Sequence, residues 1–137
     1  MRALLPLALA LILPSCFFVD DDDDDDDQPV VVVPTGLLVV DWSLSGLQDP
    51  AICRQSGADV INIAVETADG VPLGEFEDVC EAFETSIELE AGDYFGDAVL
   101  LDGSGAARTT PVDLGLVRIF GDDELVVPVD FPSDSFY

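Results

Sequence analysis

Carboxylates dominate the reactive side chains of this sequence, because other catalytic residue types are missing. The 137-residue chain contains 29 Asp and Glu residues, no His and no Lys, and its four basic residues are all arginines. His and Lys are the commonest general bases and activated amines in enzymes. Without His, a serine nucleophile lacks its usual activating partner and zinc lacks its commonest nitrogen ligand. We therefore expect no catalytic residues and predict that the protein is not an enzyme.

Carboxylates alone can hydrolyse glycosidic bonds or bind hard cations. Glycoside hydrolysis also needs a substrate cleft, which a domain of about 100 residues rarely provides. We interpret the acidic clusters as solvated loops, with a weak Ca²⁺ site as the alternative and no other cofactor expected. The candidate calcium ligands are Asp122, Asp123 and Glu124, with Asp93 and Asp97 as a second choice.

The charge of the chain restricts its partners. The formal net charge is −25 at pH 7. Such a surface repels nucleic acid, so no nucleic-acid partner is expected. Eight consecutive aspartates fill residues 20–27, and neighbouring like charges keep a segment extended and solvated. We interpret this run as a spacer, with calcium binding as the alternative. The whole segment from Cys16 to Thr35, fully extended, reaches on the order of 60–70 Å.

The N-terminus is similar to a bacterial lipoprotein signal. An arginine precedes an apolar stretch at residues 3–13, and Leu-Pro-Ser-Cys follows at residues 13–16. This resemblance to a lipobox implies lipid transfer to the sulfur of Cys16, cleavage after Ser15 and anchoring in the cell membrane or outer membrane. Pro14 departs from the usual pattern. An ordinary secretory signal with later cleavage, giving a secreted protein, is the alternative.

The resemblance divides the chain into a signal peptide (residues 1–15), a lipidated Cys16 with an acidic tether (16–35) and a folded domain (36–137). Lipidation of Cys16 leaves Cys53 and Cys80 as a pair. In an oxidising compartment the two would form a disulfide; two buried free thiols are the alternative. Their spacing differs from Cys-x-x-Cys, which argues against redox catalysis.

Alternating apolar residues predict an all-β domain. Runs at 36–44, 58–66, 85–90, 94–101, 112–120 and 124–131 have strand character, and Gly-containing turns separate them. Residues 30–33, four valines between prolines, predict an additional first strand at a sheet edge. No segment has helical period and length, and residues 74–82 are expected to form one helical turn at most. About seven strands predict a small antiparallel β-sandwich, with Trp42 in its core.

Residues 89–94, Leu-Glu-Ala-Gly-Asp-Tyr, resemble the start of a strand in transthyretin-like sandwiches of the collagen-adhesin B-type and carboxypeptidase-regulatory kind. The resemblance covers residues 36–131 and implies an immunoglobulin-like or transthyretin-like fold. The isopeptide bonds of pilin-type relatives are excluded, because they need lysine. First strands with Trp and paired cysteines are also similar to those of lipoproteins from myxobacterium-like organisms.

Three hypotheses follow. The first is a non-enzymatic, membrane-anchored surface or periplasmic lipoprotein, a monomer whose loops at 48–57 and 70–81 contact a cell-envelope protein or glycan. The second is a Ca²⁺-dependent adhesion module, which would melt at higher temperature with millimolar Ca²⁺ but not Mg²⁺. The third is a secreted hydrolase or hydrolase inhibitor, which only export and a disulfide favour.

Overall fold

The computed structural model describes residues 29–137, and short β-strands make up most of this part of the chain. Its helices are short, and among the described residues no helix is long and apolar enough to cross a membrane. The elements in chain order are β1 (Thr35–Leu44), α1 (Pro50–Ser56), β2 (Val60–Thr67), β3 (Pro72–Val79), η1 (Cys80–Ala82), β4 (Glu84–Glu90), β5 (Gly92–Leu101), β6 (Val112–Ile119), β7 (Glu124–Phe131) and η2 (Ser133–Ser135).

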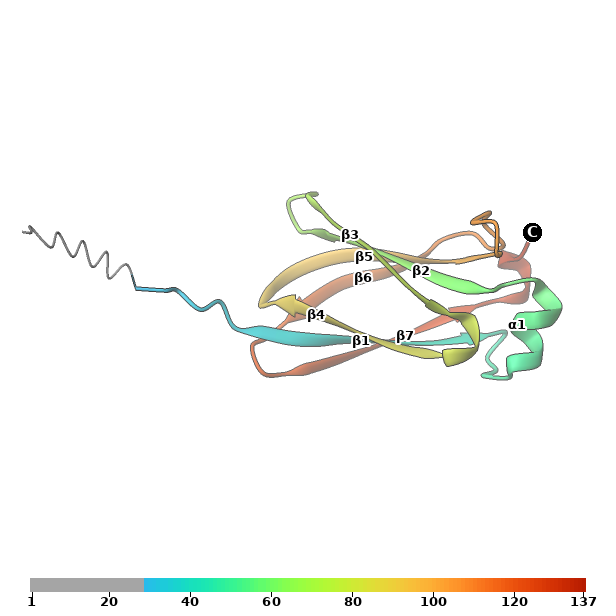
Figure 1. Ribbon diagram of the computed structural model, residues 1–137, viewed down its shortest axis with the longest axis horizontal. Coiled ribbons are helices and arrows are strands. Elements are labelled where there is room, and N and C mark those ends of the chain that lie inside the picture. Colours follow the sequence, from blue (N-terminus) through green and yellow to red (C-terminus); the bar gives the residue numbers. More distant parts are fainter. Residues whose placement is uncertain (1–28) are drawn as a thin grey trace, which may run out of the picture. The chain divides into compact units, whose positions relative to one another are not determined.

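Two sheets face each other and confirm the predicted small all-β sandwich (Figure 1). One sheet has the strand order β4-β1-β7 and the other has the order β3-β2-β5-β6. All strand pairs are antiparallel except β1 with β7, which are parallel, with Leu38 opposite Leu125. Parallel pairing requires a long connection between the two strands. Nearly the whole domain connects β1 to β7, so the fold meets this requirement.

Alternate residues of β1 and β2 build the centre of the core. Leu38, Val40, Trp42 and Leu44 are fully buried along β1, as expected for side chains that alternate across a strand. The predicted core position of Trp42 is therefore correct. From β2, the buried residues are Ile61, Ile63 and Val65. The remaining strands add Ile87, Leu89, Ala98, Leu100, Val117, Ile119, Val129 and Phe131.

The predicted strand at residues 30–33 is wrong. These valines belong to no strand, and Val30 is 86% exposed. The neighbours of β1 do not extend that far: β4 ends at Glu90, opposite Thr35, and β7 begins at Glu124, opposite Leu37. Within the described part of the chain, neither neighbour of β1 therefore extends far enough to pair with residues 30–33.

The seventh strand is β3, in a segment that we expected to be a loop with at most one helical turn. Most of its side chains are exposed, and among them only Phe76 packs against the core. Pro72 begins the strand and β3 lies at a sheet edge, where proline is tolerated. With one side chain against the core, β3 lacks the alternating pattern that predicted the other strands.

A short helix, α1, replaces the loop expected at residues 48–57. The Asp49 carboxylate accepts a hydrogen bond from the backbone N–H of Ala51 at 2.9 Å, and Pro50 occupies the first turn. Gly57 ends the helix in a left-handed conformation (φ 72°). These are the usual start and stop signals of a helix, but α1 is too short to show helical periodicity.

Candidate functional site

The predicted pairing of Cys53 with Cys80 is confirmed by a disulfide whose Cα atoms lie 6.1 Å apart. It joins α1 to η1, and both residues are buried, with exposed fractions of 1% and 0%. The alternative of two free thiols is therefore wrong. Since both sulfurs are bonded and covered, neither is available as a nucleophile or metal ligand.

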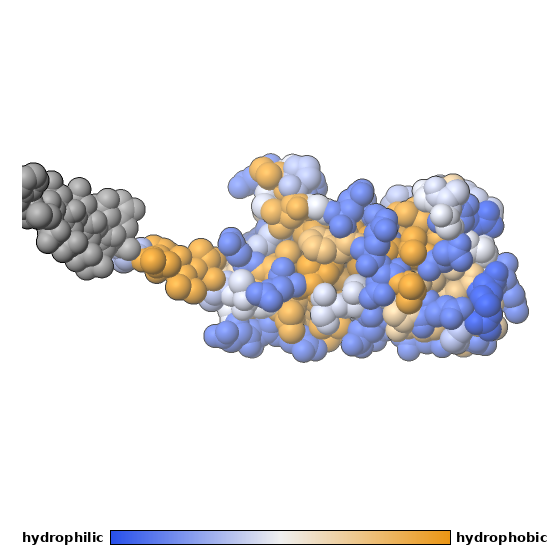
Figure 2. All heavy atoms as spheres, in the orientation of Figure 1, coloured by the Kyte–Doolittle hydropathy of each residue, from blue (hydrophilic) through white to orange (hydrophobic). Residues whose placement is uncertain are grey.

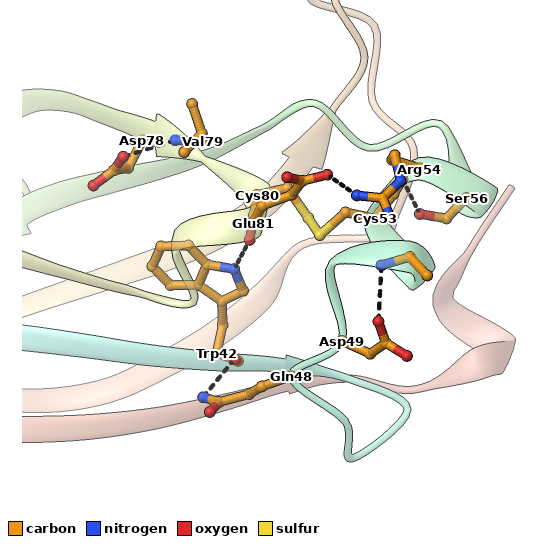
Figure 3. Close-up of a disulfide and its surroundings, with 11 residues drawn as sticks. Trp42, Gln48, Asp49, Cys53, Arg54, Ser56, Asp78, Val79, Cys80 and Glu81 are labelled. Atoms are coloured by element: carbon orange, nitrogen blue, oxygen red, sulfur yellow. Dashed lines mark hydrogen bonds and ion pairs between the residues drawn. A yellow bond between two sulfur atoms is a disulfide. The ribbon is translucent and has the colours of Figure 1, made fainter.

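Side chains around the disulfide connect it to β1 and to the surface of α1 (Figure 3). The indole N–H of Trp42 donates to the carbonyl oxygen of Cys80 at 2.9 Å. On the surface, the Arg54 guanidinium donates to the Glu81 carboxylate at 2.8 Å. A buried polar bond of this kind fixes the backbone of η1, so the site is structural rather than reactive.

Asp122 and Asp123 lie in the turn between β6 and β7, and Glu124 is the first residue of β7. The backbone of this turn holds the start of β1, because the N–H of Asp122 donates to the Thr35 carbonyl oxygen at 2.8 Å and that of Leu37 donates to the Asp123 carbonyl oxygen at 2.9 Å. Within residues 29–137, no three Asp, Glu or Cys side chains are arranged to hold one metal ion. The three candidate ligands are therefore neighbours in sequence, and binding of Ca²⁺ by them stays a prediction. Cys16 lies outside the described residues.

The second candidate pair, Asp93 and Asp97, is divided between two environments. Asp93 pairs with Arg118 across the strands at 2.9 Å, and its hydrogen bond and charge raise the pKa of Arg118 above its usual value. Asp97 lies further along β5 beside an open hollow. The structure does not bring the two carboxylates together around one cation.

The motif at residues 89–94 builds the corner between β4 and β5. Leu89 and Tyr94 are both buried, and the Tyr94 hydroxyl donates to the Glu90 carbonyl oxygen at 2.6 Å. Burial, and to a smaller extent the Glu90 carboxylate, raise the pKa of Tyr94. The motif residues therefore have a structural role in the corner.

An open hollow lies over strands β2, β3 and β5 of the four-stranded sheet, beside Ala64, whose neighbour Ile63 faces the core; we call it the outer hollow. Small residues on three neighbouring strands are among those that line it, Ala64 on β2, Gly74 on β3 and Gly96 on β5, and we call these three its floor. A Cβ on Gly96 would lie only 2.8 Å from the backbone oxygen of Ala64. The strands pack too closely at this point for a larger residue, and Phe95 lines the hollow beside them.

Four acidic residues also line the hollow: Glu66, Glu75, Asp97 and Asp113. Three of them belong to one row across the sheet, because Ala64 faces Glu75 on one side and Asp97 on the other, and Asp97 faces Asp113. Sequence reasoning missed the outer hollow because it did not predict β3. Glu75 and Glu77, which alternate with the apolar Phe76, were the available signal.

Comparisons with known proteins bear on the fold alone. No protein-family model and no curated protein matches the chain. Two solved chains match it. One is the crystal structure of a leucine-rich repeat protein from Bacteroides thetaiotaomicron VPI-5482, with a TM-score of 0.50 and 12% sequence identity. The match covers 73% of this chain and only 12% of that one.

Proposed function

We propose that this protein is an exported lipoprotein, anchored to a membrane through Cys16, whose β-sandwich performs structural or recognition work without catalysis. The buried disulfide carries the proposal, because disulfides persist mainly in oxidising compartments outside the cytosol. The leader at residues 1–15, with its resemblance to a lipobox, supplies a route to such a compartment. Two or three acyl chains on one cysteine would hold the protein durably.

The place where the described domain begins supports display of the domain. β1 starts beside the β6–β7 turn, while α1, the disulfide and the C-terminus lie at the opposite end of the sandwich (Figure 1). Attachment at one end leaves the other end and the outer faces accessible. On the face turned to the viewer in Figure 2, hydrophilic residues surround apolar patches. Both apolar and polar contacts are therefore available to a partner on this face.

The anchor is tested by metabolic labelling with an alkyne-tagged palmitate. We expect label on the wild-type protein and on Ser15→Ala, which keeps a small residue before the cysteine, and none on Cys16→Ser. An unlabelled wild-type protein, or a labelled Cys16→Ser variant, would overturn the anchor. If the wild-type protein is unlabelled, determining the N-terminal residue of the mature protein would test the alternative of an ordinary secretory signal.

Recognition is tested separately by binding of the full-chain protein to an array of cell-envelope proteins and glycans. The proposal expects saturable binding to at least one component, or a changed envelope in a deletion strain. A protein that binds nothing, in a strain whose envelope is unchanged by the deletion, would contradict it.

A further inference from the structure

The outer hollow combines an apolar floor with an uncompensated acidic rim. Asp97 and Asp113 lie opposite each other on neighbouring strands, and like charges in such positions destabilise a sheet. A basic residue at either position would relieve this repulsion. The Asp113 carboxylate reduces it only in part, by accepting the backbone N–H of Gly115 at 2.7 Å.

The arginines of the described residues are all engaged away from the hollow. Arg54 pairs with Glu81 and Arg118 pairs with Asp93. Arg108 donates to the carbonyl oxygen of Ser56 at 2.9 Å. None of them lines the hollow, so no cation within residues 29–137 balances its carboxylates.

We propose that the outer hollow binds a lysine or arginine side chain presented by a partner protein. The aliphatic stem of such a side chain would lie on the small residues of the floor, Ala64 and Gly96, while its charged end meets Glu75 and Asp97. Phe95, which lines the same hollow, is able to stack on a guanidinium. The inference rests on the recognition role proposed above and names the chemistry of its partner.

The charge of the hollow and the exposed apolar side chains beside it favour a partner protein over a second copy of this chain or a small amine. A second copy of this chain would bring a second strongly acidic surface, which like-charge repulsion disfavours. A small free amine would leave the exposed apolar side chains beside the hollow uncovered. Leu116, 54% exposed, lies directly opposite Phe95, 40% exposed. A basic side chain on a folded or extended protein segment satisfies both the acidic rim and these apolar neighbours.

The test uses NMR titration of the ¹⁵N-labelled full-chain protein, solubilised in zwitterionic detergent. The probe is a short peptide with one central arginine between alanine and valine residues. The matched control probe carries citrulline, which has the same shape without the charge. We expect the arginine peptide to shift the amide signals of Ala64, Gly74 and Gly96, and the citrulline peptide to leave them unchanged. Shifts confined to residues 20–27 would overturn the proposal, because they indicate binding to the acidic run.

Variants separate local chemistry from total charge. Glu75→Gln with Asp97→Asn should weaken binding about tenfold or more by removing the two nearest carboxylates. Asp122→Asn with Asp123→Asn changes the net charge equally, about 25 Å away along β6, and should leave affinity within twofold. Ala64→Leu keeps every charge but fills the floor, and should also weaken binding. Equal loss in the hollow and turn variants would refute the site.

Two further measurements complete the test. The melting temperature of each variant verifies folding, so that lost binding is not mistaken for unfolding. Free arginine amide should bind much more weakly than the peptide; equal affinity would contradict a protein partner. Palmitate labelling of Cys16 reports on the anchor independently, so failure of the hollow and failure of the lipoprotein proposal are distinguishable.

Discussion

The Trp42 indole donates its only hydrogen bond to the carbonyl oxygen of Cys80, 2.9 Å away. This bond links the central strand of one sheet to the residue that carries the disulfide. Trp42 is fully buried, and the rings of Trp42 and Phe83 lie 6.5 Å apart between centroids. The core and the disulfide therefore form one structural unit, on which the domain's stability depends.

Replacement of Trp42 by phenylalanine should destabilise the fold. The change leaves the Cys80 carbonyl without its partner and removes part of a fully buried ring system. An unsatisfied buried group and a cavity each cost roughly 1–3 kcal/mol. Urea unfolding followed by circular dichroism measures the loss. A variant as stable as the wild type would contradict the structural role of this bond.

Removal of the disulfide should also lower the free energy of unfolding. Cys53 and Cys80 are 27 residues apart, and closing such a loop stabilises by about 3–4 kcal/mol in the chain-entropy model. We expect the double variant Cys53→Ala with Cys80→Ala to lose about this much free energy of unfolding. A matched wild-type sample treated with reductant under denaturing conditions should refold with the same deficit. A loss below about 1 kcal/mol would show that the bond contributes little.

The N-cap of α1 gives a smaller, chemically specific effect. Asp49→Ala removes the carboxylate that accepts the Ala51 N–H, and loss of such a cap costs about 1 kcal/mol. Asp49→Asn retains an accepting oxygen and should be nearly as stable as the wild type. Chemical denaturation of the two variants compares them directly. Equal destabilisation by both would indicate that charge, rather than capping, matters at this position.

Tyr94 should ionise above the usual pH range of a tyrosine. It is buried, and its pKa is raised by that burial and by Glu90. Because the pKa of Tyr94 is higher in the folded state, its contribution to the free energy of unfolding is complete below the unfolded pKa, about 10. It is lost as pH rises through that value toward the folded pKa. Subtracting the ultraviolet titration of Tyr94→Phe from that of the wild type isolates the ionisation of Tyr94, which should appear above about pH 10. A difference step at or below about pH 10 would contradict the burial of Tyr94.

Sequence patterning predicted the elements whose side chains alternate between core and solvent. β1 is such a case: Leu38, Val40 and Trp42 face inward, and the pattern alone placed them there. The disulfide followed from the lipobox resemblance and the two remaining cysteines. The all-β class followed from several such runs together.

The missed elements depend on tertiary context. Edge strand β3 buries little besides Phe76, so its sequence lacks an apolar period. Residues 30–33 have strong strand propensity but no neighbouring strand, and remain outside the sheets. The outer hollow depends on register, which places Ala64 between Glu75 and Asp97. Register is set by the whole sheet rather than by any one segment.

The most direct test of the lipoprotein account is the intact mass of the protein purified from the membranes of cells that express it, with and without reduction before thiol alkylation. We expect a chain that begins at Cys16 and carries acyl groups, with two alkylated thiols only after reduction. A mass without acyl groups would contradict the membrane anchor. Thiols that alkylate without reduction would contradict a disulfide between Cys53 and Cys80 in the cell.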